Sequence, residues 1–85
     1  MPEITIYTTT ACAYCLAAKA LLQRKGAAFR EIDVTGDAAA REALMAKAGG
    51  SYTVPQIWIG AAHVGGSDDL HALDRSGKLA AMLAT

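Results

Sequence analysis

The period of apolar and polar residues changes several times along this 85-residue chain, and each change predicts a new element. Alternation over Glu3–Thr8 predicts a strand, because successive strand side chains point to opposite faces. The apolar period becomes helical over about Ala13–Lys25, and Gly26 is a typical residue to end a helix. Phe29–Val34 predicts a second strand. A strand, a helix and a strand within about 30 residues indicate a right-handed βαβ unit.

The next part of the chain predicts a helix followed by a hairpin. Asp37 is a good N-cap for a helix over about Ala38–Ala48. The apolar run Gln56–Ile59 is too short for a helix and lies between breakers. Gly60-Ala61 has the composition of a two-residue turn, which leads into a partner strand over Ala62–Val64. This pair predicts an antiparallel addition to the sheet.

A last helix is expected near the end of the chain. Ser67 or Asp68 is expected to cap it, Gly77 to interrupt it, and Lys78–Leu83 to resume it. The order β-α-β-α-β-β-α predicts an α/β fold with one four-stranded mixed sheet flanked by helices. We expect residues 1–85 to form a single domain.

Composition limits the partners that the chain can have. Hydrophobic residues make up 53% and charged residues 19%, so the chain is expected to fold. Eight basic and eight acidic residues give a formal net charge of zero, which argues against a nucleic acid or a membrane surface as partner. The first residues do not resemble a secretory signal, and no apolar stretch could span a bilayer. We therefore expect a cytoplasmic protein.

The two cysteines, Cys12 and Cys15, form a C-x-x-C motif at the start of the first predicted helix. Free backbone N–H groups and the positive end of the helix dipole favour an anion at this point, and a thiolate is such an anion. Cys15 lies one helical turn deeper, within bonding range of Cys12. We therefore expect Cys12 to attack a disulfide and Cys15 to resolve the mixed disulfide that results.

The C-x-x-C motif has three other possible interpretations. A structural disulfide is not favoured in a reducing cytosol. Half of a zinc site would need two more ligands, and only His63 and His71 are available. These histidines are expected to lie at the surface or to be satisfied internally. Two inert buried cysteines at a helix start would be a coincidence, so a dithiol redox site is favoured over all three.

Two further segments predict a peptide-binding site. A cis bond before Pro55 in the T-V-P segment would turn the chain and expose the backbone of Val54 for pairing with an extended peptide. The segment Gly65–Asp69 opens the last helix, where free N–H groups can hold a carboxylate and Asp68 can hold an ammonium group. The ligand implied is a short peptide with a central thiol and a free α-amino acid end.

Three stretches, ITIYTTTACAYC, TVPQIWI and VGGSDDL, together resemble those of a glutaredoxin, in the order and at about the spacing of that family. The resemblance covers essentially the whole chain and is greatest to the short bacterial dithiol class. It implies a thioredoxin-like fold and a monomer that takes part in electron transport and cell redox homeostasis. It also implies glutathione as co-substrate, with protein disulfides and glutathione mixed disulfides as substrates. No resident metal is implied.

The resemblance also assigns roles to individual residues. Cys12 would take the glutathionyl group and Cys15 would be the resolving thiol. Thr53 and Val54 would pair with the cysteinyl backbone of glutathione, beside a cis Pro55. The residues expected to contact glutathione are Tyr14, Arg41, Thr53, Val54, Pro55, Gly66, Ser67 and Asp68, the last three at its γ-glutamyl end.

The chain departs from the family pattern at several positions. Ala13 replaces the proline of the usual C-P-Y-C motif, which removes a rigid φ and restores one backbone N–H near the thiolate. Thr9 stands where a lysine is common, and Ser51-Tyr52 stand where a basic or long polar residue is common. These positions help to hold the glycine carboxylate of glutathione, and Arg41 matches another position used for that carboxylate.

Two alternative functions follow from the resemblance. Some glutaredoxins bind an iron–sulfur cluster as dimers, each copy giving its first cysteine (here Cys12) together with two glutathione molecules. A [2Fe-2S] cluster remains a possible cofactor here, because proline at the position of Ala13 tends to disfavour cluster binding and this chain lacks that proline. Other relatives are reduced by thioredoxin reductase, but these tend to lack Tyr14 and the acidic pair Asp68-Asp69, which this chain has.

Overall fold

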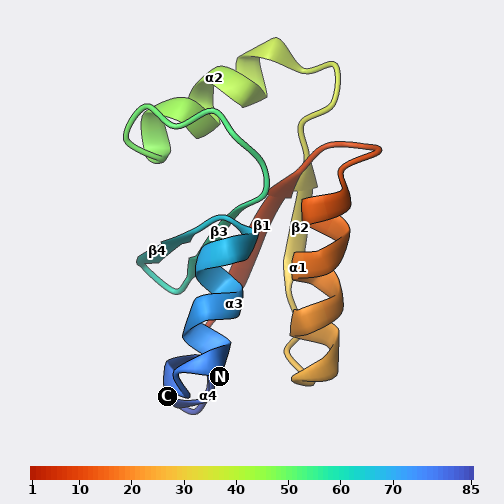
Figure 1. The fold of residues 1–85 in the computed structure, drawn as a ribbon. Helices are drawn as coiled ribbons and strands as arrows, with labels where there is room; N and C mark the ends of the chain where they lie inside the picture. The colour runs from red at the N-terminus through yellow and green to blue at the C-terminus, as the bar shows by residue number, and fades with distance from the viewer.

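The computed structural model describes all of residues 1–85, which form four strands and four helices (Figure 1). No helix combines the length and the apolar character needed to cross a membrane. In chain order the elements are β1 (Ile4–Thr8), α1 (Ala13–Arg24), β2 (Arg30–Asp33), α2 (Ala38–Lys47), β3 (Gln56–Ile59), β4 (Ala62–Gly65), α3 (Ser67–Arg75) and α4 (Lys78–Leu83).

The four strands form one mixed sheet in the order β2-β1-β3-β4, as expected. β1 and β2 are parallel, whereas β1 pairs with β3, and β3 with β4, in antiparallel fashion. The β3–β4 hairpin turns at Gly60, whose φ of 58° requires a residue without a Cβ penalty. The antiparallel register places Tyr7 opposite Gln56, so the carboxyl end of β1 lies beside the start of β3.

Helices cover both faces of this sheet. On one face α1 packs beside α3, and α4 adjoins α3 (Figure 1). On the other face Trp58 packs against Leu44 of α2 and against Ala48, the C-cap of that helix. Because β3 is covered on both faces, all four of its residues are buried, which explains its continuous apolar run. The main core consists of Ile4, Ile6, Ala18, Leu21, Leu22, Ala27, Ile57, Ile59, Leu70, Leu79 and Leu83.

The start of α3 differs from the prediction. Gly66, rather than Ser67 or Asp68, is the N-cap, with extended backbone angles of φ −94° and ψ −168°. The Asp69 carboxylate reaches back and accepts a hydrogen bond from the Gly66 N–H at 3.0 Å. This bond satisfies a donor at the helix start without a side chain on the capping residue. The predicted interruption at Gly77 is confirmed, since its φ of 80° separates α3 from α4.

A polar contact joins the parallel pair of strands below the first helix. The buried Thr8 hydroxyl donates to Glu31 Oε2 at 2.7 Å, and Lys19 of α1 pairs with the same oxygen at 3.0 Å. The hydrogen bond from Thr8, and then the one from Lys19, lower the pKa of Glu31. The contact therefore stabilises the ionised carboxylate and links β1, β2 and α1.

We predict that Thr8→Val lowers the free energy of unfolding by about 1 kcal/mol at neutral pH, because it removes the hydroxyl but keeps the side-chain shape. The folded-state pKa of Glu31 lies below its ordinary value of 4.5, so the stabilisation is present above that value. It is lost as the pH falls through the folded-state pKa. Urea unfolding at neutral pH and at about pH 3 measures the difference. Thr5→Val, on the other face of β1, is the control; an equal loss at both pH values would contradict the prediction.

Candidate active site

Cys12 is the N-cap of α1, directly after the loop that leaves β1. Ala11 has a positive φ of 56°, and Cys12 is extended at φ −109° and ψ 107°, so the chain turns sharply into the helix. The Cys15 N–H donates to Cys12 Sγ at 3.1 Å, and the Leu16 N–H donates to the Cys12 carbonyl. A sulfur atom that accepts a helical N–H is stabilised as the anion. The expected position of Cys12 is confirmed.

Cys15 is buried one turn further along α1. Burial, and then its hydrogen-bonding contact with Cys12, raise its pKa to about 11, against an opposing backbone hydrogen bond at Thr9. Both cysteines are free thiols in this structure. The two therefore differ in chemistry, because Cys12 is partly exposed at the helix N-terminus and Cys15 is held as a neutral thiol in the core.

The T-V-P loop faces Cys12 across the site. The Val54 carbonyl oxygen lies 4.0 Å from Cys12 Sγ, and the peptide bond between Val54 and Pro55 is cis, as expected. Tyr52, the residue before the T-V-P segment, is anchored to α2. Arg41 of that helix donates from Nε and Nη2 to the Tyr52 carbonyl at 3.2 and 2.7 Å. Segments from two distant parts of the chain thus meet at the reactive sulfur.

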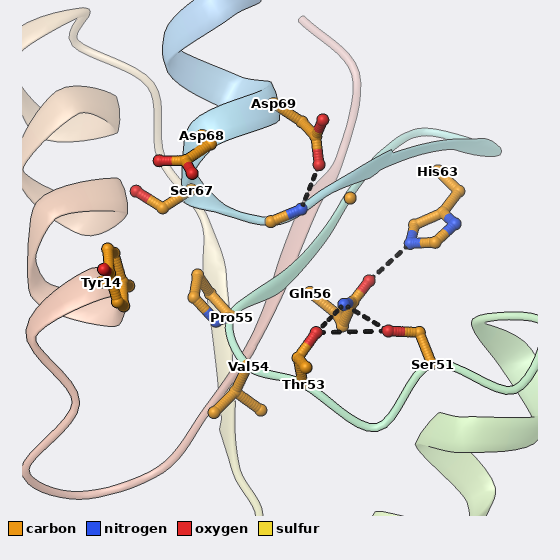
Figure 2. Close-up of a pocket in the computed structure, with 12 residues that line it drawn as sticks. Tyr14, Ser51, Thr53, Val54, Pro55, Gln56, His63, Ser67, Asp68 and Asp69 are labelled. Carbon is orange, nitrogen blue, oxygen red and sulfur yellow. Dashed lines mark hydrogen bonds between the residues drawn. The ribbon is translucent and has the colours of Figure 1, made fainter.

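A pocket of about 400 Å³ lies between the T-V-P loop, the start of α3 and the first turn of α1 (Figure 2). Its lining brings together seven of the predicted site residues. The lining residues are Tyr14, Ser51, Thr53, Val54, Pro55, Gln56, His63, Gly65, Gly66, Ser67, Asp68 and Asp69. Tyr14 remains largely exposed, at 65%, so its ring offers a wall for a ligand.

Three predicted residues lie outside the lining of this pocket. Cys12 and Cys15 line a neighbouring cavity of about 220 Å³ together with Lys19, and Cys12 reaches the pocket through its contact with Val54. Arg41 lines neither cavity, and two of its nitrogen atoms are bound to the Tyr52 carbonyl. Its structural contact is therefore with the loop that carries the site.

Two lining residues, Gln56 and His63, were given no role at the site by the sequence. The other three beyond the predicted site residues, Ser51, Gly65 and Asp69, lie in segments that the sequence had indicated. Gln56 is only 4% exposed, yet it is a polar residue within an apolar strand, and this contrast was the available signal. His63 is hydrogen-bonded to Gln56 and stacks on Trp58 with ring centroids 4.5 Å apart. The prediction that His63 is a satisfied or surface residue agrees with this contact but did not identify its partner.

Comparison with known proteins assigns the chain to a family. A sequence model of the glutaredoxin family matches residues 4–64. The chain belongs to the glutaredoxin family. It is 61% identical over 84 residues to a glutaredoxin of Pseudomonas aeruginosa, with 99% of each chain covered. It is 52% identical over 83 residues to glutaredoxin 3 of Escherichia coli, with 98% of this chain and 99% of the relative covered.

The structural comparison agrees. A buckwheat glutaredoxin in complex with glutathione superposes with a TM-score of 0.87 at 33% identity, covering 95% of this chain and 76% of the other. This glutaredoxin therefore has the thioredoxin-like fold that the resemblance implied, and it has thiol–disulfide oxidoreductase activity. Cys12 and Cys15 are the only two cysteines of the chain.

We predict that Cys15 in a Cys12→Ser protein reacts slowly with iodoacetamide at neutral pH. Its rate should rise about tenfold per pH unit, without a plateau below about pH 10, because only the thiolate is alkylated. Burial, the largest cause of the raised pKa, is retained in this variant. Mass spectrometry measures the rate of alkylation at each pH, with N-acetylcysteine as the reference thiol. A plateau near the pKa of the free thiol would contradict the prediction.

We predict that Gly65→Ala disrupts the start of α3. Gly65 has a φ of 109°, and a Cβ built there would overlap the Asp69 carboxylate. Gly36→Ala is the matched control, because its φ is 70° but a Cβ would meet no atom within 4 Å. The free energy of unfolding should fall by about 1 kcal/mol in the control, because alanine is strained in the left-handed conformation. It should fall by more in Gly65→Ala. Equal urea midpoints for the two variants would refute the steric argument.

Proposed function

We propose that this glutaredoxin reduces glutathione mixed disulfides and protein disulfides, with glutathione as its reductant. The observation that carries the proposal is the position of Cys12 Sγ, which accepts the Cys15 N–H and lies 4.0 Å from the Val54 carbonyl oxygen at the pocket. A thiolate beside an exposed peptide edge is suited to attack a disulfide within an extended peptide.

The monothiol route uses Cys12 alone. The Cys12 thiolate attacks the glutathione sulfur of a mixed disulfide, forming a Cys12–glutathione disulfide and releasing the substrate thiolate, which takes up a proton. The thiolate of a second glutathione then attacks the bound glutathione sulfur. Oxidised glutathione leaves, and the electron pair of the broken bond returns to Cys12 as its thiolate.

The dithiol route adds Cys15 for protein disulfides. Cys12 attacks one sulfur of the protein disulfide and releases the other as a thiolate. Cys15 must then lose its proton and attack Cys12 Sγ, forming the Cys12–Cys15 disulfide and freeing the second protein thiol. Two glutathione molecules restore both thiols. Because burial disfavours the Cys15 thiolate, the attack by Cys15 is the step on which this route depends.

The pocket supports the proposed arrangement of glutathione. We assign its γ-glutamyl end to Gly66, Ser67 and Asp68, where helix N–H groups can hold a carboxylate and the Asp68 carboxylate can hold the ammonium group. Its cysteinyl backbone would pair with Thr53 and Val54. Pro55 and Tyr14 would lie beside it. Arg41 as a ligand of the glycine carboxylate stays a prediction.

The two alternative functions also stay predictions. No group of three or more histidine, cysteine or acidic side chains converges anywhere in the structure. A cluster bound through Cys12 would therefore need ligands from glutathione and from a second copy of the chain. Reduction by thioredoxin reductase in place of glutathione is the other alternative.

We expect the wild type and Cys15→Ser to turn over a glutathione mixed disulfide in the presence of glutathione, glutathione reductase and NADPH. Cys12→Ser should fall to the uncatalysed rate, because no other thiolate lies at the site. Consumption of NADPH measures the turnover. Activity retained by Cys12→Ser would contradict the proposal, as would a wild type that turns over only with thioredoxin reductase as the electron donor.

A further inference from the structure

A polar network lies at one end of the pocket, around the buried side chain of Gln56 (Figure 2). Gln56 Nε2 lies 3.3 Å from Ser51 Oγ and 3.1 Å from Thr53 Oγ1. Gln56 Oε1 lies 2.7 Å from His63 Nε2, and the two hydroxyl oxygens are 3.2 Å apart. Four side chains from β3, β4 and the loop before β3 are thus joined through one amide.

The chemistry of the amide sets the direction of each hydrogen bond. The NH₂ group can only donate, so the oxygens of Ser51 and Thr53 accept from it. The amide oxygen can only accept, so His63 Nε2 carries a proton and donates. One hydroxyl proton bridges Ser51 and Thr53, and the other is left to donate outward. Gln56 therefore makes the hydroxyl pair a hydrogen-bond donor toward the pocket.

This donor matters because His63 is the only basic side chain in the lining of the pocket. Its charged lining residues are Asp68 and Asp69, and no lysine or arginine lines it. Arg41 is bound to the Tyr52 carbonyl and lies outside the lining. Within the lining itself, the hydroxyl pair is therefore available to recognise a ligand carboxylate at the end of the pocket away from α3, whatever Arg41 adds from outside it.

The order of the site fixes which carboxylate reaches that end. Figure 2 shows Asp68 at the α3 end of the pocket, Val54, Thr53 and Ser51 at the other end, and Pro55 between the two ends. A tripeptide with its thiol at Cys12 and its α-amino acid end at Asp68 would extend its remaining end toward the hydroxyl pair. In glutathione that end is the glycine carboxylate.

We propose that Gln56, held by His63, is a positioning residue that directs the Ser51–Thr53 hydroxyl pair toward the glycine carboxylate of glutathione. The site then selects a tripeptide whose C-terminal carboxylate is free. The inference rests on the proposed function and adds a determinant of specificity to it.

Gln56→Glu tests this inference with little change in shape. A carboxylate still accepts from His63, but it has no N–H, so both hydroxyls turn inward to donate to it. It also brings a negative charge close to the ligand carboxylate. Gln23→Glu, at an exposed position of α1, introduces the same charge away from the pocket and is the control.

The assay is a single turnover of the reduced protein with a fluorescent peptide joined by a disulfide either to glutathione or to its glycine monoethyl ester. Release of the peptide thiol is followed at increasing substrate concentration. The wild type should prefer the free carboxylate, and Gln56→Glu should reduce this preference at least about tenfold, mainly in the half-saturating concentration. Gln23→Glu should retain the wild-type preference.

His63 provides a second pair of variants. His63→Leu removes the donor and should reduce the preference in the same direction, whereas His63→Gln can still donate to Gln56 Oε1 and should restore most of it. An equal loss for both substrates in Gln56→Glu, or an unchanged preference, would overturn the inference. A wild type that does not react with the glutathione disulfide would instead refute the proposed function.

Discussion

The hydrogen bond from the Cys15 N–H to Cys12 Sγ is the interaction on which the site depends. It exists because α1 begins immediately after Cys12, and because the positive φ of Ala11 turns the chain from β1 into the helix. The same helical turn that supplies the donor places Cys15 in the core, where burial raises its pKa to about 11. One short motif thus yields a partly exposed thiol at the start of the helix and a buried thiol one turn further on.

The order of the strands assembles the rest of the site. β1 and β3 are neighbours, and their antiparallel register sets the carboxyl end of β1 beside Gln56, so the loop before β3 reaches Cys12. The pairing of Gly65 with Ile57 then returns β4 to the same end of the sheet, where α3 begins. Three loops that are distant in the sequence therefore surround one pocket, as expected where strands and helices meet in an open α/β sheet.

The sequence predicted the elements and the position of Cys12 at the start of the first helix, because local signals specify them. The cis Pro55 was implied by the family resemblance. The sequence did not predict that Gly66 caps α3, since that cap depends on Asp69 reaching back from within the helix. It also missed the link between Gln56 and His63, because the link depends on hairpin register, including the irregularity between Ile57 and Trp58. Arg41 illustrates the same limit, since its contact with the Tyr52 carbonyl depends on how α2 packs.

The most direct test of this account is the structure of a Cys15→Ser protein whose Cys12 carries a glutathionyl group, a species that cannot resolve internally. The account predicts that the tripeptide pairs with the Val54 backbone, with its γ-glutamyl end at Gly66 and Asp68 and its glycine carboxylate at Thr53. A glutathionyl group lying outside this pocket, or in the opposite direction, would contradict the account.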